Sequence, residues 1–233
     1  MKNWLEIAVG IYLLGMVLYG NYRGFIRQAV SMVALIATLV IVDAAMPQVT
    51  AWMRDNTPIH TWIAEHMEER FALEETAQMP AEQRMIIEGL ELPEDVKALL
   101  LENNNNQVYE ILGVDAFAEY IGNYLANMVL NLIGFVALFI VVYVMMRLLM
   151  KALDLMAKLP ILSGINQLAG ALLGGAQGLL FLWIASLVVT ACSSMPWAMV
   201  IIEKIESSWW LAFIYHYNFV SKMALGILKG ILS

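Results

Sequence analysis

The chain has 233 residues, of which 61% are hydrophobic and only 14% are charged. Soluble domains are about 45–50% apolar and about 25% charged, so this composition excludes an ordinary soluble domain and places much of the chain in lipid. A single cysteine, Cys192, excludes an intramolecular disulfide, and no cysteines and histidines have the spacing of a zinc site.

Residues 1–46 predict an uncleaved hairpin of two membrane-spanning helices. The first apolar run covers about residues 4–20 and the second about residues 25–46, where Pro47 is expected to end it. One lysine precedes the first run, as in a signal peptide, but no small-x-small cleavage site follows. The turn of the hairpin carries Arg23 and Arg27, one helical turn apart.

Residues 47–121 form an acidic segment of different character. It carries 15 acidic and 4 basic residues, in a chain whose formal net charge is -7. Its apolar residues keep a helical spacing, as in the series Ile59, Trp62, Ile63, Met67 and Phe71. We therefore expect three or four short amphipathic helices that form a small water-facing layer.

Two further membrane spans are predicted within residues 122–192. The third covers about residues 123–147 and the fourth about residues 164–191. A basic connection over residues 147–160 joins them, and it carries Arg147, Lys151 and Lys158.

The fourth span has a glycine face, because Gly170, Gly174 and Gly178 recur every four residues. Small residues at this spacing let the backbone of another helix come close. The docked helix is either the first or second span of the same chain, or the fourth span of a neighbouring copy. We favour the same chain, because even a monomer has to bury this face.

Amide side chains in the same two spans complete the candidate site. Asn127 and Asn131 lie in the third span, whereas Asn166 and Gln177 lie in the fourth, beside the glycine face. Polar groups are costly in hydrocarbon and therefore face protein or water. The favoured interpretation is hydrogen bonding between helices, and the alternative is a polar path through an oligomer.

Residues 193–233 are expected to form an outer loop and a last helix. The apolar run over residues 209–232 is long enough to cross a membrane, yet Asn218, Lys222, Gly226 and Lys229 repeat along one side of it. An amphipathic helix lying in the membrane interface has this pattern, and we favour it over a fifth span.

Basic residues near the ends of spans predict the orientation of the chain. Arg23 and Arg27 lie on the same side as Arg147, Lys151 and Lys158 when four spans cross the membrane. Lysine and arginine in short loops favour the cytoplasm, so the N-terminus and the acidic segment are expected outside.

Two blocks of the sequence resemble the colicin V production protein (CvpA) family. One block is Tyr22-Arg23-Gly24-Phe25; the other runs from Lys158-Leu159-Pro160 through Asn166 to Gly170-Ala171-Leu172-Leu173-Gly174 and Gly178. The resemblance implies a small bacterial inner-membrane protein linked to toxin production or export and to envelope stress. It implies no known reaction.

The sequence contains no candidate catalytic site. The three histidines do not form a cluster, and no serine or cysteine has a base nearby in sequence. We therefore predict an all-α, non-enzymatic membrane protein without a cofactor, a metal or a nucleic-acid partner. The lipid bilayer is the expected partner; a second copy of the chain, and an envelope or secretion protein on the acidic segment, are candidates. The favoured function is an accessory or scaffold factor, and the alternative is an oligomeric channel or transporter-like protein lined by the glycine and amide face.

Overall fold

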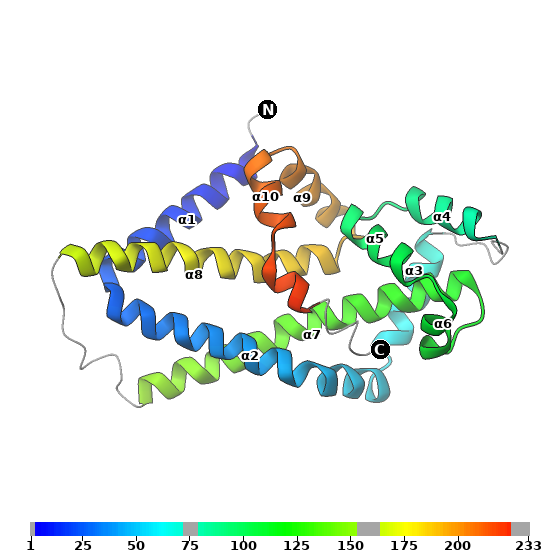
Figure 1. Ribbon diagram of the computed structural model, residues 1–233, viewed down its shortest axis with the longest axis horizontal. Coiled ribbons are helices and arrows are strands. Elements are labelled where there is room, and N and C mark those ends of the chain that lie inside the picture. Colours follow the sequence, from blue (N-terminus) through cyan, green and yellow to red (C-terminus); the bar gives the residue numbers. More distant parts are fainter. Residues whose placement is uncertain (1–2, 72–78, 153–163, 225–233) are drawn as a thin grey trace. The chain divides into compact units, whose positions relative to one another are not determined.

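The computed structural model describes residues 3–71, 79–152 and 164–224. Every regular element within these ranges is a helix (Figure 1). Four of the helices are long and apolar enough to cross a membrane: α1 (Trp4–Arg23), α2 (Phe25–Asn56), α7 (Phe117–Ala152) and α8 (Gly164–Ala191). A span needs about 20 apolar residues, and each of these helices provides at least that length. The prediction of four helices able to span a membrane is confirmed.

Two of these helices, α1 and α2, extend beyond their predicted ends. α1 continues to Arg23, whereas α7, which covers Phe117–Ala152, contains the predicted third span together with flanking helical turns. α2 does not end before Pro47 but passes through it and continues to Asn56. Proline removes one backbone donor, which leaves the carbonyl of Asp43 without its usual helical partner, but it does not have to end a helix whose flanking turns are well packed. Met46 and Thr50, on either side of Pro47, are both buried.

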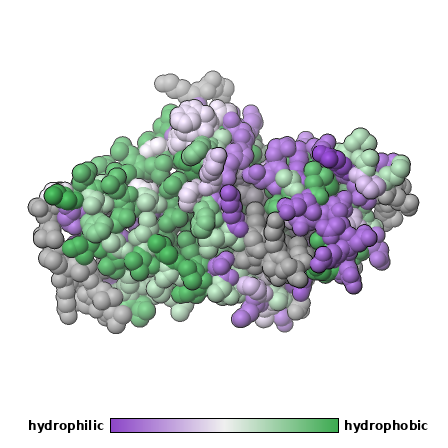
Figure 2. Space-filling view, in the orientation of Figure 1, coloured by the Kyte–Doolittle hydropathy of each residue, from purple (hydrophilic) through white to green (hydrophobic). Residues whose placement is uncertain are grey.

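The chain divides into two compact units. Unit 1 contains residues 1–45, 135–188 and 203–223, and unit 2 contains residues 46–134, 189–202 and 224–233. α2, α7 and α8 therefore contribute residues to both units. Hydrophobic residues cover α1, α2 and α8 on the face that Figure 2 shows, whereas hydrophilic residues gather over α4 and α5.

Unit 2 holds the acidic segment as four short helices. They are α3 (Ile59–Phe71), α4 (Pro80–Gly89), α5 (Glu94–Asn103) and α6 (Asn106–Leu112). The apolar side of α3 packs on α7, where Ile63 and Ala64 form a buried cluster with Ala126 and Val129. Tyr120, at the start of α7, is fully buried and its hydroxyl donates to the backbone carbonyl of Leu100, 2.7 Å away. The short helices are therefore held by packing and not by helical propensity alone.

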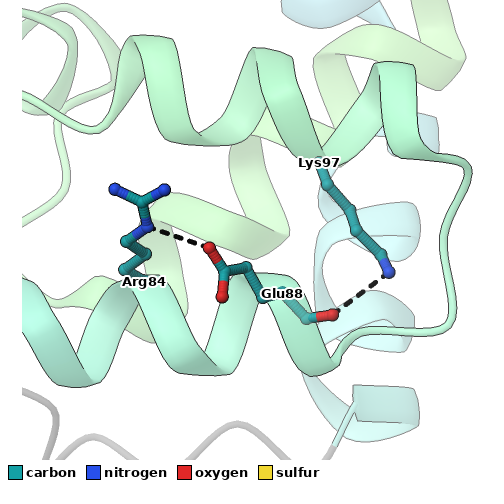
Figure 3. A network of polar contacts seen from close by, with 3 residues as sticks. All are labelled: Arg84, Glu88 and Lys97. Carbon is teal, nitrogen blue, oxygen red and sulfur yellow. Dashed lines mark hydrogen bonds and ion pairs between the residues drawn. The ribbon is translucent and has the colours of Figure 1, made fainter.

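Figure 3 shows an ion pair within α4 and a hydrogen bond that joins α5 to α4. Arg84 forms an ion pair with the Glu88 carboxylate, at 2.9 Å between Nε and Oε1, and Lys97 Nζ donates to the backbone carbonyl of Glu88. Exposed ion pairs of this kind contribute little to stability, so the buried Ile87, Val96 and Leu100 carry most of the packing.

The C-terminal run is not one continuous helix. α9 covers Pro196–Glu206 and α10 covers Trp209–His216, after which the helix breaks at Tyr217 and Asn218. The Asn218 side chain accepts from the backbone N–H of Ser221, so it caps a new helical turn. An eight-residue helix is about 12 Å long, too short to cross a membrane, which corrects the expectation of a single helix over residues 209–232. Gly226 and Lys229 lie outside the described residues.

Candidate functional site

The glycine face of α8 packs directly on α1 within unit 1 (Figure 1). A Cβ atom added to Gly170 would lie 2.5 Å from the carbonyl oxygen of Gly20 and 2.7 Å from the carbonyl carbon of Gly24. One added to Gly174 would collide with the carbonyl of Met16 and lie 2.8 Å from the Cα of Gly20. Backbone therefore touches backbone, a separation that no residue larger than glycine permits.

Gly178 and Asn166 extend this contact at its two ends. A Cβ on Gly178 would lie 2.8 Å from the Cβ of Met16, and the Tyr12 hydroxyl donates to the Gly178 carbonyl at 3.2 Å. At the other end, the Asn166 amide lies against the Cα of Gly24, which ends α1 with φ at 77°. Glycine adopts a positive φ of this kind without strain. The Tyr22–Phe25 turn thus meets the segment that opens α8.

Gln177 lies beside the glycine face and reaches α2. Its Oε1 accepts a short hydrogen bond from the Gln28 amide, and its own amide lies 3.5 Å from the Tyr143 hydroxyl on α7. Gln28 has no exposed surface and Gln177 is 4% exposed. A buried chain of hydrogen bonds therefore joins three apolar helices. The side-chain oxygen of Gln28, Oε1, has no partner among the described residues.

Two arginines from different helices meet at one buried hydroxyl close to this chain. Arg23 Nη1 donates to Ser31 Oγ at 2.9 Å, and Arg147 Nη1 approaches the same oxygen at 3.4 Å. The Arg147 guanidinium also lies 5.9 Å from the centre of the Tyr143 ring. Charged groups in membrane helices are costly, and their position next to buried amides marks this cluster as a candidate functional site.

The remaining predicted residues lie elsewhere. Asn131 and Asn127 belong to unit 2: the Thr50 hydroxyl donates to Asn131 Oδ1 at 2.5 Å, and Asn127 donates to the Asn123 carbonyl one turn earlier in α7. Arg27 is half-buried on α2, and Lys151 is exposed in the last turn of α7. Lys158 and most of the predicted basic connection lie outside the described residues.

The sequence reasoning missed four residues, one in the α1–α8 glycine contact and three in the polar cluster. They are Gly20, Gln28, Ser31 and Tyr143. The Gly20-x-x-x-Gly24 spacing in the first span carried the signal for a partner of the α8 groove, because it repeats the small-residue spacing of that groove. Gln28 and Ser31 share a face of α2, but that face has no sequence mark that distinguishes it from the others.

Cys192 and His60 belong to unit 2, whereas this cluster belongs to unit 1. Among the described residues, no group of three or more metal-ligating side chains occurs. Cys192 follows α8 directly, and partial burial raises the pKa of its thiol, which disfavours the reactive thiolate. Burial and the nearby Arg54 lower the pKa of His60 in α3, which favours the neutral imidazole.

Comparison with known proteins adds a family to this geometry. Residues 110–230 match the family model described as colicin V production protein. The matched range includes the glycine face and α8 as a whole, whereas the Tyr22–Phe25 turn precedes it. No curated protein and no solved structure matches the chain.

Proposed function

This chain belongs to the colicin V production protein family, and from that premise we propose that it is a non-enzymatic accessory or scaffold factor of the bacterial inner membrane. It acts in toxin production or export, or in envelope homeostasis. The packing of the α8 glycine face on α1 of the same chain is the observation that carries the proposal, because α1 fills the face that the channel alternative requires as a pore lining.

The helices of the acidic segment are the partner-binding part in this proposal. α4 exposes Met85 at 65%, and Met79 directly before α4 is 60% exposed, among acidic neighbours. Apolar side chains on an otherwise hydrophilic surface favour a protein contact. A photo-crosslinking residue at Met85 should yield a discrete heavier product in intact cells. Leu172 on α8, at 73% exposure, is the matched control and should give no protein product; equal products at both positions, or none at Met85, would reject the binding role.

The channel alternative predicts a different electrical behaviour. Gly170 and Gly174 are filled by α1, and Gln177 is bonded to Gln28, so a pore along this face would require α1 and α2 to move away. We expect the purified chain in planar bilayers to give no conductance steps above those of protein-free bilayers. Reproducible steps of one size would support the channel instead of the scaffold.

Orientation follows the basic residues at the span ends. We place the N-terminus and α3–α6 outside, and Arg23, Arg27 and Arg147 at the cytoplasmic side. In a Cys192→Ala background, a membrane-impermeant thiol reagent should label Gln107→Cys on intact cells and spare Lys151→Cys, both exposed positions. Permeabilised cells should label both. Labelling of position 151 alone on intact cells would contradict this orientation and indicate the opposite one.

A further inference from the structure

An apolar groove of about 480 Å³ runs between α2 and α7 within unit 1, where these helices lie side by side (Figure 1). All of its lining side chains are apolar. They include Ile26, Val30 and Val33 on one wall and Met146, Leu149 and Met150 on the other. On a helix bundle able to cross a membrane, such a groove accepts a hydrocarbon chain. Apolar walls alone do not select the headgroup attached to that chain.

Cations flank the groove on both helices. Arg27 follows Ile26 on α2, and Arg147 follows Met146 on α7; both arginines are half-buried. At about 100° per residue, Arg27 is about 20° from the groove residue Ala34, and Arg147 is about 60° from Met150. Each guanidinium therefore stems from the edge of a wall and not from the opposite side of its helix.

These two cations lack an acidic partner within the described part of the chain. Neither Arg27 nor Arg147 forms an ion pair with a described carboxylate. Arg147 instead directs one N–H at the Ser31 hydroxyl, which Arg23 also approaches, and this leaves further donors on its guanidinium. A cation at the edge of hydrocarbon needs a counter-ion, and a guanidinium matches the paired oxygens of a phosphodiester.

We propose that this groove binds an anionic glycerophospholipid. One acyl chain lies between α2 and α7, the phosphate accepts from Arg147 and Arg27, and Ser31 orients the Arg147 guanidinium. The proposal depends on the chain being a membrane protein and not on its accessory role, so the failure of either leaves the other standing.

The test uses the full chain in mixed micelles with equal amounts of phosphatidylglycerol and phosphatidylcholine of identical acyl chains. Native mass spectrometry counts each retained lipid. We expect wild type to enrich phosphatidylglycerol, and Arg147→Gln or Arg27→Gln to reduce that enrichment about five-fold each, since one basic residue near an anionic surface contributes about 1 kcal/mol. Arg84→Gln on α4 removes the same charge outside the groove and should leave the enrichment unchanged.

A groove-filling change provides a second arm that does not alter charge. Ala37→Phe should reduce the total number of retained lipids while the arginines stay in place. Equal retention of both lipids by wild type would overturn the proposal, as would unchanged enrichment in the Arg27→Gln/Arg147→Gln double variant. A dimeric mass without bound lipid would show that a second copy covers the groove, which also overturns it.

Discussion

Gly174→Leu should destabilise the protein by about 3 kcal/mol or more. Overpacking a filled site costs about 1–3 kcal/mol, and the upper end applies where the obstructing atoms are backbone and cannot rotate away. At Gly174 those atoms are the Met16 carbonyl and the N and Cα of Gly20. Thermal unfolding of both proteins in one detergent measures the difference.

Gly15→Leu is the matched control for this change. Gly15 lies in α1, as Gly20 does, but a Cβ added there meets nothing within 4 Å. Its replacement should be neutral or slightly stabilising, because leucine favours a helix over glycine by roughly 0.5–1 kcal/mol. Gly20→Leu should be as damaging as Gly174→Leu, since it obstructs the same contact from the other side. A Gly174→Leu variant as stable as wild type would mean that α1 does not pack on this face.

Gln177→Leu should lower the free energy of unfolding by about 1–2 kcal/mol. The change removes the acceptor of the Gln28 amide, which has no exposed surface, and an unsatisfied buried donor costs about 1–3 kcal/mol. Hydrogen bonds between membrane helices average about 0.6 kcal/mol, so the expected loss exceeds that of an ordinary one because both partners are buried in protein.

The double variant Gln28→Leu/Gln177→Leu distinguishes a hydrogen bond from simple packing. With both amides replaced, no donor is left unsatisfied, and most of the stability lost in Gln177→Leu should return. Gln167→Leu is the control, because Gln167 is exposed on the same helix and should tolerate leucine. If the stability lost in the double variant equals the sum of the losses in the two single variants, the two amides do not depend on each other.

The sequence by itself determined the four helices able to span a membrane, the family and the position of the glycine face. These properties are local: about 20 consecutive apolar residues identify a span, and Gly170, Gly174 and Gly178 mark one side of a helix whatever that helix contacts. The bounds of α8, Gly164–Ala191, agree with the predicted fourth span for the same reason.

Whether a helix ends at Pro47 or at Asn218 depends on the residues packed around those positions. A proline signals a helix end only when no packing offsets the lost hydrogen bond, and α2 continues through Pro47 between buried residues. The apolar run after Trp209 predicts a long helix, but Asn218 donates to the Trp183 carbonyl and to Ser186 on α8, and the helix breaks there. These contacts join residues 35 and 32 positions apart, and no local pattern encodes them.

The tertiary structure alone brings the polar cluster together. Gln28, Ser31, Tyr143, Arg147 and Gln177 lie on three helices, and only the packing of those helices brings their side chains together. Arginines that the sequence marks as signals of orientation become half-buried donors to a shared hydroxyl. Charge patterns along a chain predict on which side of a membrane a residue lies, whereas its partner depends on which face each helix turns inward, a property of the whole bundle.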